Sequence, residues 1–248
     1  MRALTTVALL VLAGAPVDAS DRNLATVWTI ADDLSLPVER DLLREDFVIK
    51  QRLMPTGVAQ FVDQGAASAI DPALASAQLV ELKSTGVVVF CDPEIRGQKA
   101  IGHAQPCFVD TDSDGRFESM FFTSSVTKGL LTVQGNRPKN SKPILPIAYR
   151  RTPIEDFKPQ YFVGIQYRGN ANIFGNHIFE INYGSKEKMG SLTERFLVKK
   201  NEIPAMRTPF GGKFTLLSEF AGGIRIRVDK PFPKQHFGIV QTTTYRVY

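Results

Sequence analysis

Residue types that commonly carry enzyme chemistry are scarce in this chain. It has three histidines (His103, His177 and His236), two cysteines and one tryptophan among 248 residues. The serine-hydrolase motif G-x-S-x-G, the zinc-protease motif H-E-x-x-H and the phosphate-binding motif G-x-x-x-x-G-K-[ST] are all absent. The sequence therefore gives no support to a serine hydrolase, a zinc protease or a phosphate-binding loop of these three types. A hydrolase whose active site is assembled from residues distant in sequence stays open as an alternative.

Long apolar runs are also missing, except near the N-terminus. Arg2 is followed by the uncharged apolar run Ala3–Ala13. Val17-Asp18-Ala19 then provides residues of small or moderate size at the positions that precede a signal-peptidase cleavage site. The run is about half the ~20 apolar residues that span a bilayer. The pattern predicts a cleavable signal peptide over residues 1–19, cut between Ala19 and Ser20. The mature chain is therefore expected to be exported, periplasmic or extracellular, without a transmembrane segment.

The two cysteines, Cys91 and Cys107, form an even pair that encloses 15 residues. In an exported protein such a pair is most simply a disulfide, and closing a loop of this size stabilises by about 3 kcal/mol in the chain-entropy model. The alternative is a nucleophilic Cys107 served by His103. A free thiol would be oxidised in an oxidising compartment, so the disulfide is favoured.

Period-two alternation of apolar and polar residues recurs along the chain and helical periodicity is rare. Half-buried antiparallel strands are expected at residues 47–53, 161–168, 178–183 and 223–229. The continuous run Val87–Phe90 favours a strand covered on both faces. Short helices are expected at residues 35–44 and 71–77. The predicted fold is all-β, mainly antiparallel and sandwich-like, with one or two short helices.

Charge is distributed unevenly between the two halves of the chain. Residues 151–248 carry 15 Lys plus Arg against 8 Asp plus Glu, whereas residues 1–150 carry 15 against 17. We therefore expect an N-terminal β region over residues 20–145 and a basic C-terminal β region over residues 146–248, or one continuous domain. Arg225 and Arg227, on the outward side of one strand, are candidates to bind an anionic envelope component. A solvated, Lys- and Arg-rich sheet face is the plainer interpretation. No nucleic acid is expected as a partner.

The motif with the clearest chemistry is acidic and follows Cys107. Asp110, Asp112 and Asp114 alternate, Gly115 follows directly, and Glu118 comes four residues after Asp114. Ca²⁺ takes 6–8 oxygen ligands, and a tight loop turns alternate side chains toward one point. Glycine accepts the positive φ of a sharp turn. The backbone carbonyl of Arg116 would supply one more ligand.

The pattern D-x-D-x-D-G resembles the first half of an EF-hand loop, and D-x-D-x-D-G-x-x-[DE] resembles the calcium loops of FG-GAP and thrombospondin type 3 repeats. Phe121 stands where an EF-hand has its bidentate glutamate, and the flanks resemble strands, so the hairpin-type loop fits better. The resemblance covers about a dozen residues and implies calcium binding through Asp110, Asp112, Asp114, the Arg116 carbonyl and Glu118. A solvated acidic turn is the alternative.

Together these features predict an exported, non-catalytic β protein of the cell envelope or secreted fraction. It would be stabilised by a structural calcium loop and a disulfide, and it would act as a binding module.

Overall fold

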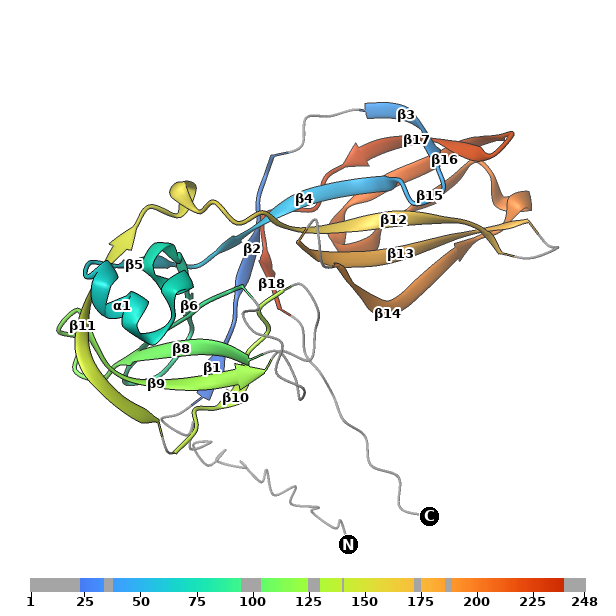
Figure 1. Ribbon diagram of the computed structural model, residues 1–248. Helices are drawn as coiled ribbons and strands as arrows, with labels where there is room; N and C mark the ends of the chain where they lie inside the picture. Colours follow the sequence, from blue (N-terminus) through green and yellow to red (C-terminus); the bar gives the residue numbers. More distant parts are fainter. Residues whose placement is uncertain are drawn as a thin grey trace, which may run out of the picture.

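The computed structural model describes residues 23–33, 38–94, 104–124, 130–139, 141–171, 175–185 and 189–238. The expected signal peptide, residues 1–19, and His103 lie outside these ranges. All pairings between the described strands are antiparallel, which confirms the all-β prediction. Figure 1 shows two lobes joined by connections that run between them.

The first lobe is a closed barrel with the strand order β11-β5-β6-β7-β8-β9. The strands are β5 (Val58–Phe61), β6 (Leu79–Leu82), β7 (Val88–Cys91), β8 (Ala104–Asp110), β9 (Arg116–Ser124) and β11 (Lys142–Thr152). Beside them, β1 (Asn23–Ala25) pairs with β10 (Gln134–Asn136). Closing the sheet leaves no unpaired edge among the barrel strands.

The barrel interior is filled with aromatic rings. Phe108 and Phe117 lie 5.5 Å apart between ring centroids, and Phe117 stacks on Tyr149 at 4.2 Å. Helix α1 (Gln64–Ile70) and the 3₁₀ helix η1 (Pro72–Ser76) place the buried residues Ala67 and Leu74 in the same apolar cluster. These two short helices therefore close the barrel core. Only the second of them is expected from the sequence.

The second lobe pairs a six-stranded sheet with a four-stranded one. The first has the order β14-β13-β12-β4-β2-β18 and the second β15-β16-β17-β3. The six-stranded sheet contains β2 (Trp28–Ile30), β4 (Phe47–Pro55), β12 (Tyr161–Ala171), β13 (Asn176–Ser185), β14 (Met189–Val198) and β18 (His236–Phe237). The four-stranded sheet contains β3 (Val38–Leu43), β15 (Ala205–Arg207), β16 (Lys213–Phe220) and β17 (Gly223–Lys230).

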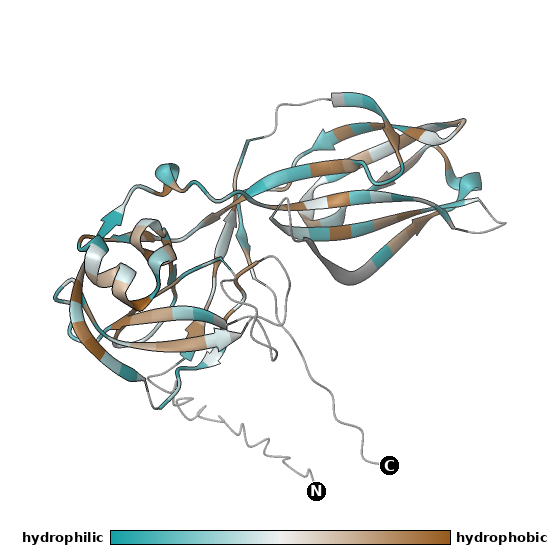
Figure 2. Ribbon diagram, in the orientation of Figure 1, coloured by the Kyte–Doolittle hydropathy of each residue, from teal (hydrophilic) through white to brown (hydrophobic). Residues whose placement is uncertain are grey.

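Facing apolar side chains join these two sheets. Phe179 of β13 lies 5.4 Å from Phe214 of β16, between ring centroids, and both rings are fully buried. Figure 2 shows polar residues interspersed with apolar ones along β12 and β13, and the apolar residues of one face belong to this core. Short 3₁₀ turns interrupt the connections: η2 (Ile154–Asp156), η3 (Lys200–Glu202) and η4 (Pro209–Gly211).

The helix expected at residues 35–44 is wrong. Residues 38–43 form β3, an edge strand whose Asp41 and Leu42 lie opposite Arg225 and Ile224 of β17. Pairing with a neighbour far away in sequence outweighs the weak local helix signal, because it satisfies the backbone donors and buries Leu42.

Strands from both parts of the chain build the second lobe. The expected boundary between residues 145 and 146 falls inside β11, and β4 of the first part pairs with β12 of the second. The lone tryptophan, Trp28, lies where the lobes meet, with 1% of its surface exposed. Its ring centroid is 5.0 Å from that of Tyr161. One apolar core therefore continues from the second lobe to the outer face of the barrel.

Candidate functional site

The acidic motif forms the turn between β8 and β9, two strands of the barrel. Asp110 ends β8, Arg116 begins β9, and the turn residues between them include two with positive φ, Ser113 (64°) and Gly115 (87°). Glycine meets that requirement without a steric penalty, whereas Ser113 adopts a conformation that is uncommon for a residue with a side chain. The flanking elements are strands, as the hairpin-type interpretation predicts.

Four carboxylates converge on this turn. Asp110, Asp112, Asp114 and Glu118 each place one oxygen within 4.8 Å of the others, which makes the group able to hold a metal ion. Asp110 is fully buried, Glu118 is half-buried, and Asp112 and Asp114 are exposed. Like charges at such separations repel one another, and a bound cation removes that repulsion.

Asp110 organises the turn from its base. Its Oδ1 accepts a hydrogen bond from the Ser113 amide (2.6 Å), and its Oδ2 accepts from the Gly115 amide (3.1 Å) and the Tyr149 hydroxyl (2.8 Å). Burial, and then this hydrogen bond, raise the pKa of Tyr149, so the phenol stays protonated and donates. A carboxylate oxygen has two lone pairs, and Oδ1 therefore keeps one for a cation.

Glu118 closes the turn from β9. Its Oε2 accepts hydrogen bonds from the amide and the hydroxyl of Thr111, at 2.9 and 3.1 Å. Its Oε1 is shielded from solvent and has no hydrogen-bond partner among the residues that the structure describes. A buried carboxylate oxygen without a partner is costly, because it has lost water without gaining a donor. The other hydrogen bonds of the turn do not compensate for the burial of this oxygen atom.

Arg116 directs its charge away from the carboxylates. Its guanidinium donates to the carbonyl of Pro146 on β11 (3.2 Å), while its amide donates to Asp114 Oδ1 (2.8 Å). The Arg116 side chain thus leaves the inner side of the turn to oxygen atoms.

The predicted disulfide is confirmed and lies close to this turn. Cys91 and Cys107 are bonded and face each other across β7 and β8, and in the same ladder Val88 lies opposite Asp110. Cys107 has no free thiol, so the alternative of a nucleophilic cysteine is wrong. The disulfide ties the strand that leads into the acidic turn to its neighbour.

The two arginines expected to bind anions lie on β17, where Arg225 is exposed and Arg227 is half-exposed. Acidic side chains lie next to both of them. Arg225 makes two hydrogen bonds to Asp41, at 2.7 and 3.1 Å. Arg227 bonds Asp229 at 2.6 Å and lies 3.8 Å from Glu39. Hydrogen bonds and attraction from these carboxylates raise the pKa of both guanidinium groups. A ligand at this face would have to displace these partners.

Two histidines stand on opposite parts of the six-stranded sheet. His177 on β13 has 1% of its surface exposed and bonds Tyr167 through Nδ1 (3.1 Å) and Glu219 through Nε2 (2.6 Å). His236 on β18 is exposed and separated from β13 by three strands. Tyr167, His177 and Glu219 form a hydroxyl–imidazole–carboxylate chain, but both ring nitrogens are occupied by buried or half-buried protein groups. This arrangement fits a structural link between the two sheets.

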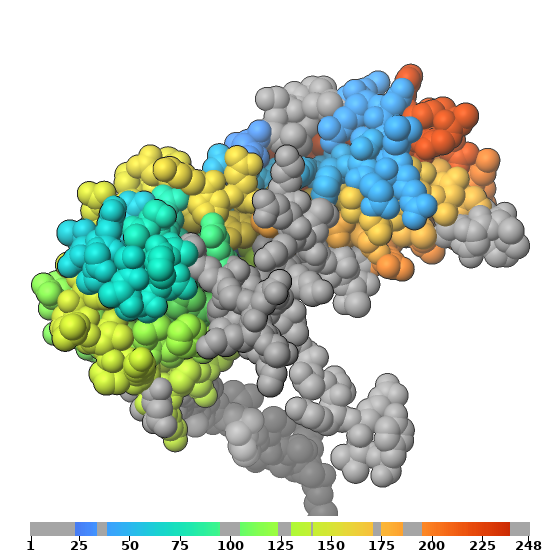
Figure 3. Space-filling view, in the orientation of Figure 1, coloured from blue at the N-terminus to red at the C-terminus, as the bar shows by residue number. Residues whose placement is uncertain are grey.

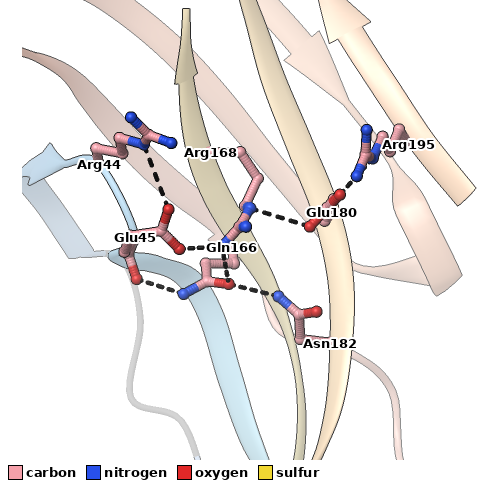
Figure 4. A network of polar contacts seen from close by, with 7 residues as sticks. All are labelled: Arg44, Glu45, Gln166, Arg168, Glu180, Asn182 and Arg195. Carbon is pink, nitrogen blue, oxygen red and sulfur yellow. Dashed lines mark hydrogen bonds and ion pairs between the residues drawn. The ribbon is translucent and has the colours of Figure 1, made fainter. Parts of the chain in front are cut away.

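A larger polar network covers the other face of the same sheet, as Figure 4 shows. The buried carboxylate of Glu180 is paired with Arg168 (3.0 Å) and with Arg195. Gln166 donates to the Glu45 carbonyl (2.7 Å) and accepts from Asn182 (2.6 Å). Each buried member has a partner, so the network is satisfied internally and stabilises the sheet.

No family model, curated protein or solved structure matches this chain. None of the helices among the described residues is long and apolar enough to cross a membrane.

Proposed function

We propose that this protein is an exported, non-catalytic binding protein whose acidic turn holds a structural calcium ion. The observation that carries the calcium part is the orphaned, solvent-shielded Oε1 of Glu118, a residue whose carboxylate converges with those of three aspartates. A cation at this point gives that oxygen the partner that the described part of the chain does not supply.

The donor set favours calcium over other common metals. All candidate ligands are oxygens, from Asp110, Asp112, Asp114, Glu118 and the carbonyl of Arg116. Hard cations prefer carboxylate and carbonyl oxygen, and Ca²⁺ accepts 6–8 of them in flexible geometry, whereas Mg²⁺ demands near-ideal octahedral geometry. A site filled by protein ligands leaves little open coordination for a substrate, so the ion's role is to stabilise the β8–β9 turn.

Export is supported by the N-terminal pattern and by the buried disulfide. Residues 1–19 have the charge, apolar run and small residues of a signal peptide, and disulfides persist in oxidising compartments. Sequencing the N-terminus of the protein recovered outside the cytosol tests this part, and we expect Ser20 as the first residue.

Thermal melting with EDTA and with added Ca²⁺ tests the calcium part. At a Ca²⁺ concentration of about 100 Kd the folded state gains about 2.7 kcal/mol, so the melting temperature should rise by several degrees. We expect Asp112→Asn and Glu118→Gln to lose this response. Asp112→Asn should also raise the melting temperature in EDTA, because it removes one of the repelling charges. Exposed Asp33, outside the turn, provides the matched control Asp33→Asn.

A melting temperature that is the same in EDTA, Ca²⁺ and Mg²⁺, together with no heat of Ca²⁺ binding in calorimetry, would remove the calcium site. The turn would then be an acidic hairpin held only by hydrogen bonds to its carboxylates, chiefly those of Asp110 and Glu118.

An exported hydrolase is the second candidate function. The chain Tyr167–His177–Glu219 has the groups of a proton relay, but its imidazole is buried and fully hydrogen-bonded. A substrate would have to open the contact between the two sheets to reach it, so the binding function is the better supported of the two.

A further inference from the structure

A polar cleft with a volume of about 930 Å³ lies beside the connections between the lobes. Its walls come from β4, β5, the end of β11, η2 and the single residues Gln78, Phe157, Lys158 and Gln160. Figure 1 shows the connection from β11 to β12 crossing between the lobes, and in Figure 3 its yellow atoms form part of the surface there. The cleft is in the size range of small-ligand sites and is remote in sequence from the acidic turn.

Three of the cations that line the cleft pair with no acidic side chain in the described part of the chain. Arg52, Arg150 and Lys158 are exposed, and no ion pair joins any of them to another described residue. This differs from Arg225 and Arg227, whose charges are neutralised by neighbouring carboxylates. Unpaired guanidinium groups bind carboxylate, sulfate and phosphate with two parallel hydrogen bonds.

A fourth cation is fixed at the cleft by its neighbours. Arg151 makes two hydrogen bonds to Glu81, at 2.6 and 2.7 Å, and its guanidinium lies 5.1 Å from the centre of the Phe90 ring. Its charge is largely used in that pair, so the attraction for an anion comes mainly from the three unpaired cations.

The cleft also contains groups that a purely anionic ligand would avoid. Glu155 and Asp156 of η2 line it, together with the amides of Gln60 and Gln160. Carboxylates repel phosphates, but they accept hydrogen bonds from hydroxyl groups, and amides both donate and accept. A ligand that carries hydroxyls next to an anionic group uses both sets of side chains.

Hydrogen bonds attach one wall of the cleft, the η2 connection, to the barrel. The amide of Gln78 donates to the Asp156 carbonyl (2.9 Å) and accepts from the Lys158 amide (2.7 Å), so the barrel holds the η2 connection from both sides of Phe157. Phe157 is itself buried against Trp28. A preformed site avoids part of the ordering cost of binding.

We infer that this cleft binds an acidic saccharide, with Arg52, Arg150 and Lys158 on its anionic group and Glu155, Asp156 and the glutamine amides on its hydroxyls. The inference rests on the binding role proposed above and names the ligand class and the place. It does not depend on calcium in the β8–β9 turn.

Calorimetry of the full mature protein with three probes tests the inference. We expect oligogalacturonate or a heparin-derived oligosaccharide to bind, and binding to weaken as salt rises. A neutral maltooligosaccharide should not bind, and polyphosphate, which lacks hydroxyls, should bind at least ten-fold more weakly. The double variant Arg52→Gln/Arg150→Gln, which removes two cations from the cleft, should reduce affinity for the acidic saccharide at least ten-fold. Arg225→Gln/Arg227→Gln, with the same loss of charge, should leave it unchanged.

Binding of polyphosphate as tight as that of the acidic saccharide, or equal losses in both double variants, would overturn the inference in favour of general charge attraction. Absence of binding by every acidic probe would overturn it as well. The melting response to Ca²⁺, measured in the same samples, separates this failure from failure of the calcium site.

Discussion

At the scale of single residues, buried ionisable groups are held by specific partners. Glu219 joins the two sheets of the second lobe, since it bonds buried His177 and, at 2.9 Å, Lys200. Burial alone raises the pKa of this carboxyl, but the hydrogen bonds from Lys200 and His177 outweigh burial and leave the pKa below its usual value. The charged form is therefore the one that the fold stabilises.

This pairing makes stability depend on pH. A carboxyl whose folded pKa is depressed binds fewer protons in the folded state. Its contribution is complete above the unfolded pKa of 4.5 and is lost as pH falls through the folded pKa. At pH 7 we expect Glu219→Gln to reduce the free energy of unfolding by about 1–2 kcal/mol. Below pH 4 the difference from wild type should shrink, in denaturant titrations at each pH.

The control is Glu155→Gln on η2. It removes one negative charge, as Glu219→Gln does, but Glu155 is exposed and forms no ion pair with another described residue. A Glu219→Gln penalty that stays constant from pH 7 to pH 3 would contradict the role given to the ionised carboxylate.

At the scale of elements, β7 shows how one strand serves two cores. Phe90 packs into the barrel cluster, whereas Val89 and Cys91 belong to the core that continues into the second lobe. The apolar run of residues 87–90 predicts a strand covered on both faces, and this prediction is confirmed. The sequence does not say what covers each face, because that depends on β8, β6 and the second lobe.

The disulfide between β7 and β8 acts on the same element. The two cysteines are 16 positions apart in the sequence. Loss of the disulfide should reduce the free energy of unfolding by about 3 kcal/mol, because the unfolded chain is then no longer constrained by the closed loop. We expect Cys91→Ala/Cys107→Ala to unfold at correspondingly lower denaturant, measured by circular dichroism. The wild type in reducing agent is the matched control, since it keeps both buried sulfur atoms.

The acidic turn should survive this change, because β8 and β9 are paired along most of their length independently of the disulfide. If the double variant loses its melting response to Ca²⁺, the acidic turn depends on the disulfide more strongly than the pairing of β8 with β9 indicates.

At the scale of the whole molecule, the single tryptophan reports on the junction between the lobes. Trp28 is buried against Phe157 and Tyr161, and its indole N–H donates to the Leu131 carbonyl at 3.0 Å. Its neighbours come from both lobes and from the connection between them. The junction is a packed core with a satisfied polar group.

Tryptophan fluorescence should therefore follow separation of the lobes. We expect a blue-shifted emission in the native protein and a red shift on unfolding that coincides with the loss of β-structure by circular dichroism. Trp28→Phe should reduce the free energy of unfolding by about 1–3 kcal/mol, because it leaves the Leu131 carbonyl without its donor. Fluorescence that changes at lower denaturant than circular dichroism would show that the lobes separate before they unfold.

The amino-acid sequence alone predicts the all-β class, the strands β4, β12, β13 and β17, the disulfide and the acidic turn. These features rest on local patterns: alternation with period two, an even pair of cysteines, and alternating aspartates before a glycine. The site residues Asp110 to Glu118 could be found in this way because they are contiguous.

The remaining features depend on contacts between residues that are far apart in the sequence. The edge strand β3, where a short helix is expected, exists because β17 pairs with it. The barrel closes because β11 reaches both β5 and β9. Arg225 and Arg52 are similar cations in the sequence, yet one has Asp41 across its ladder and the other faces a cleft. Which arginine is free for a ligand is set by strand pairing, and strand pairing depends on the whole chain.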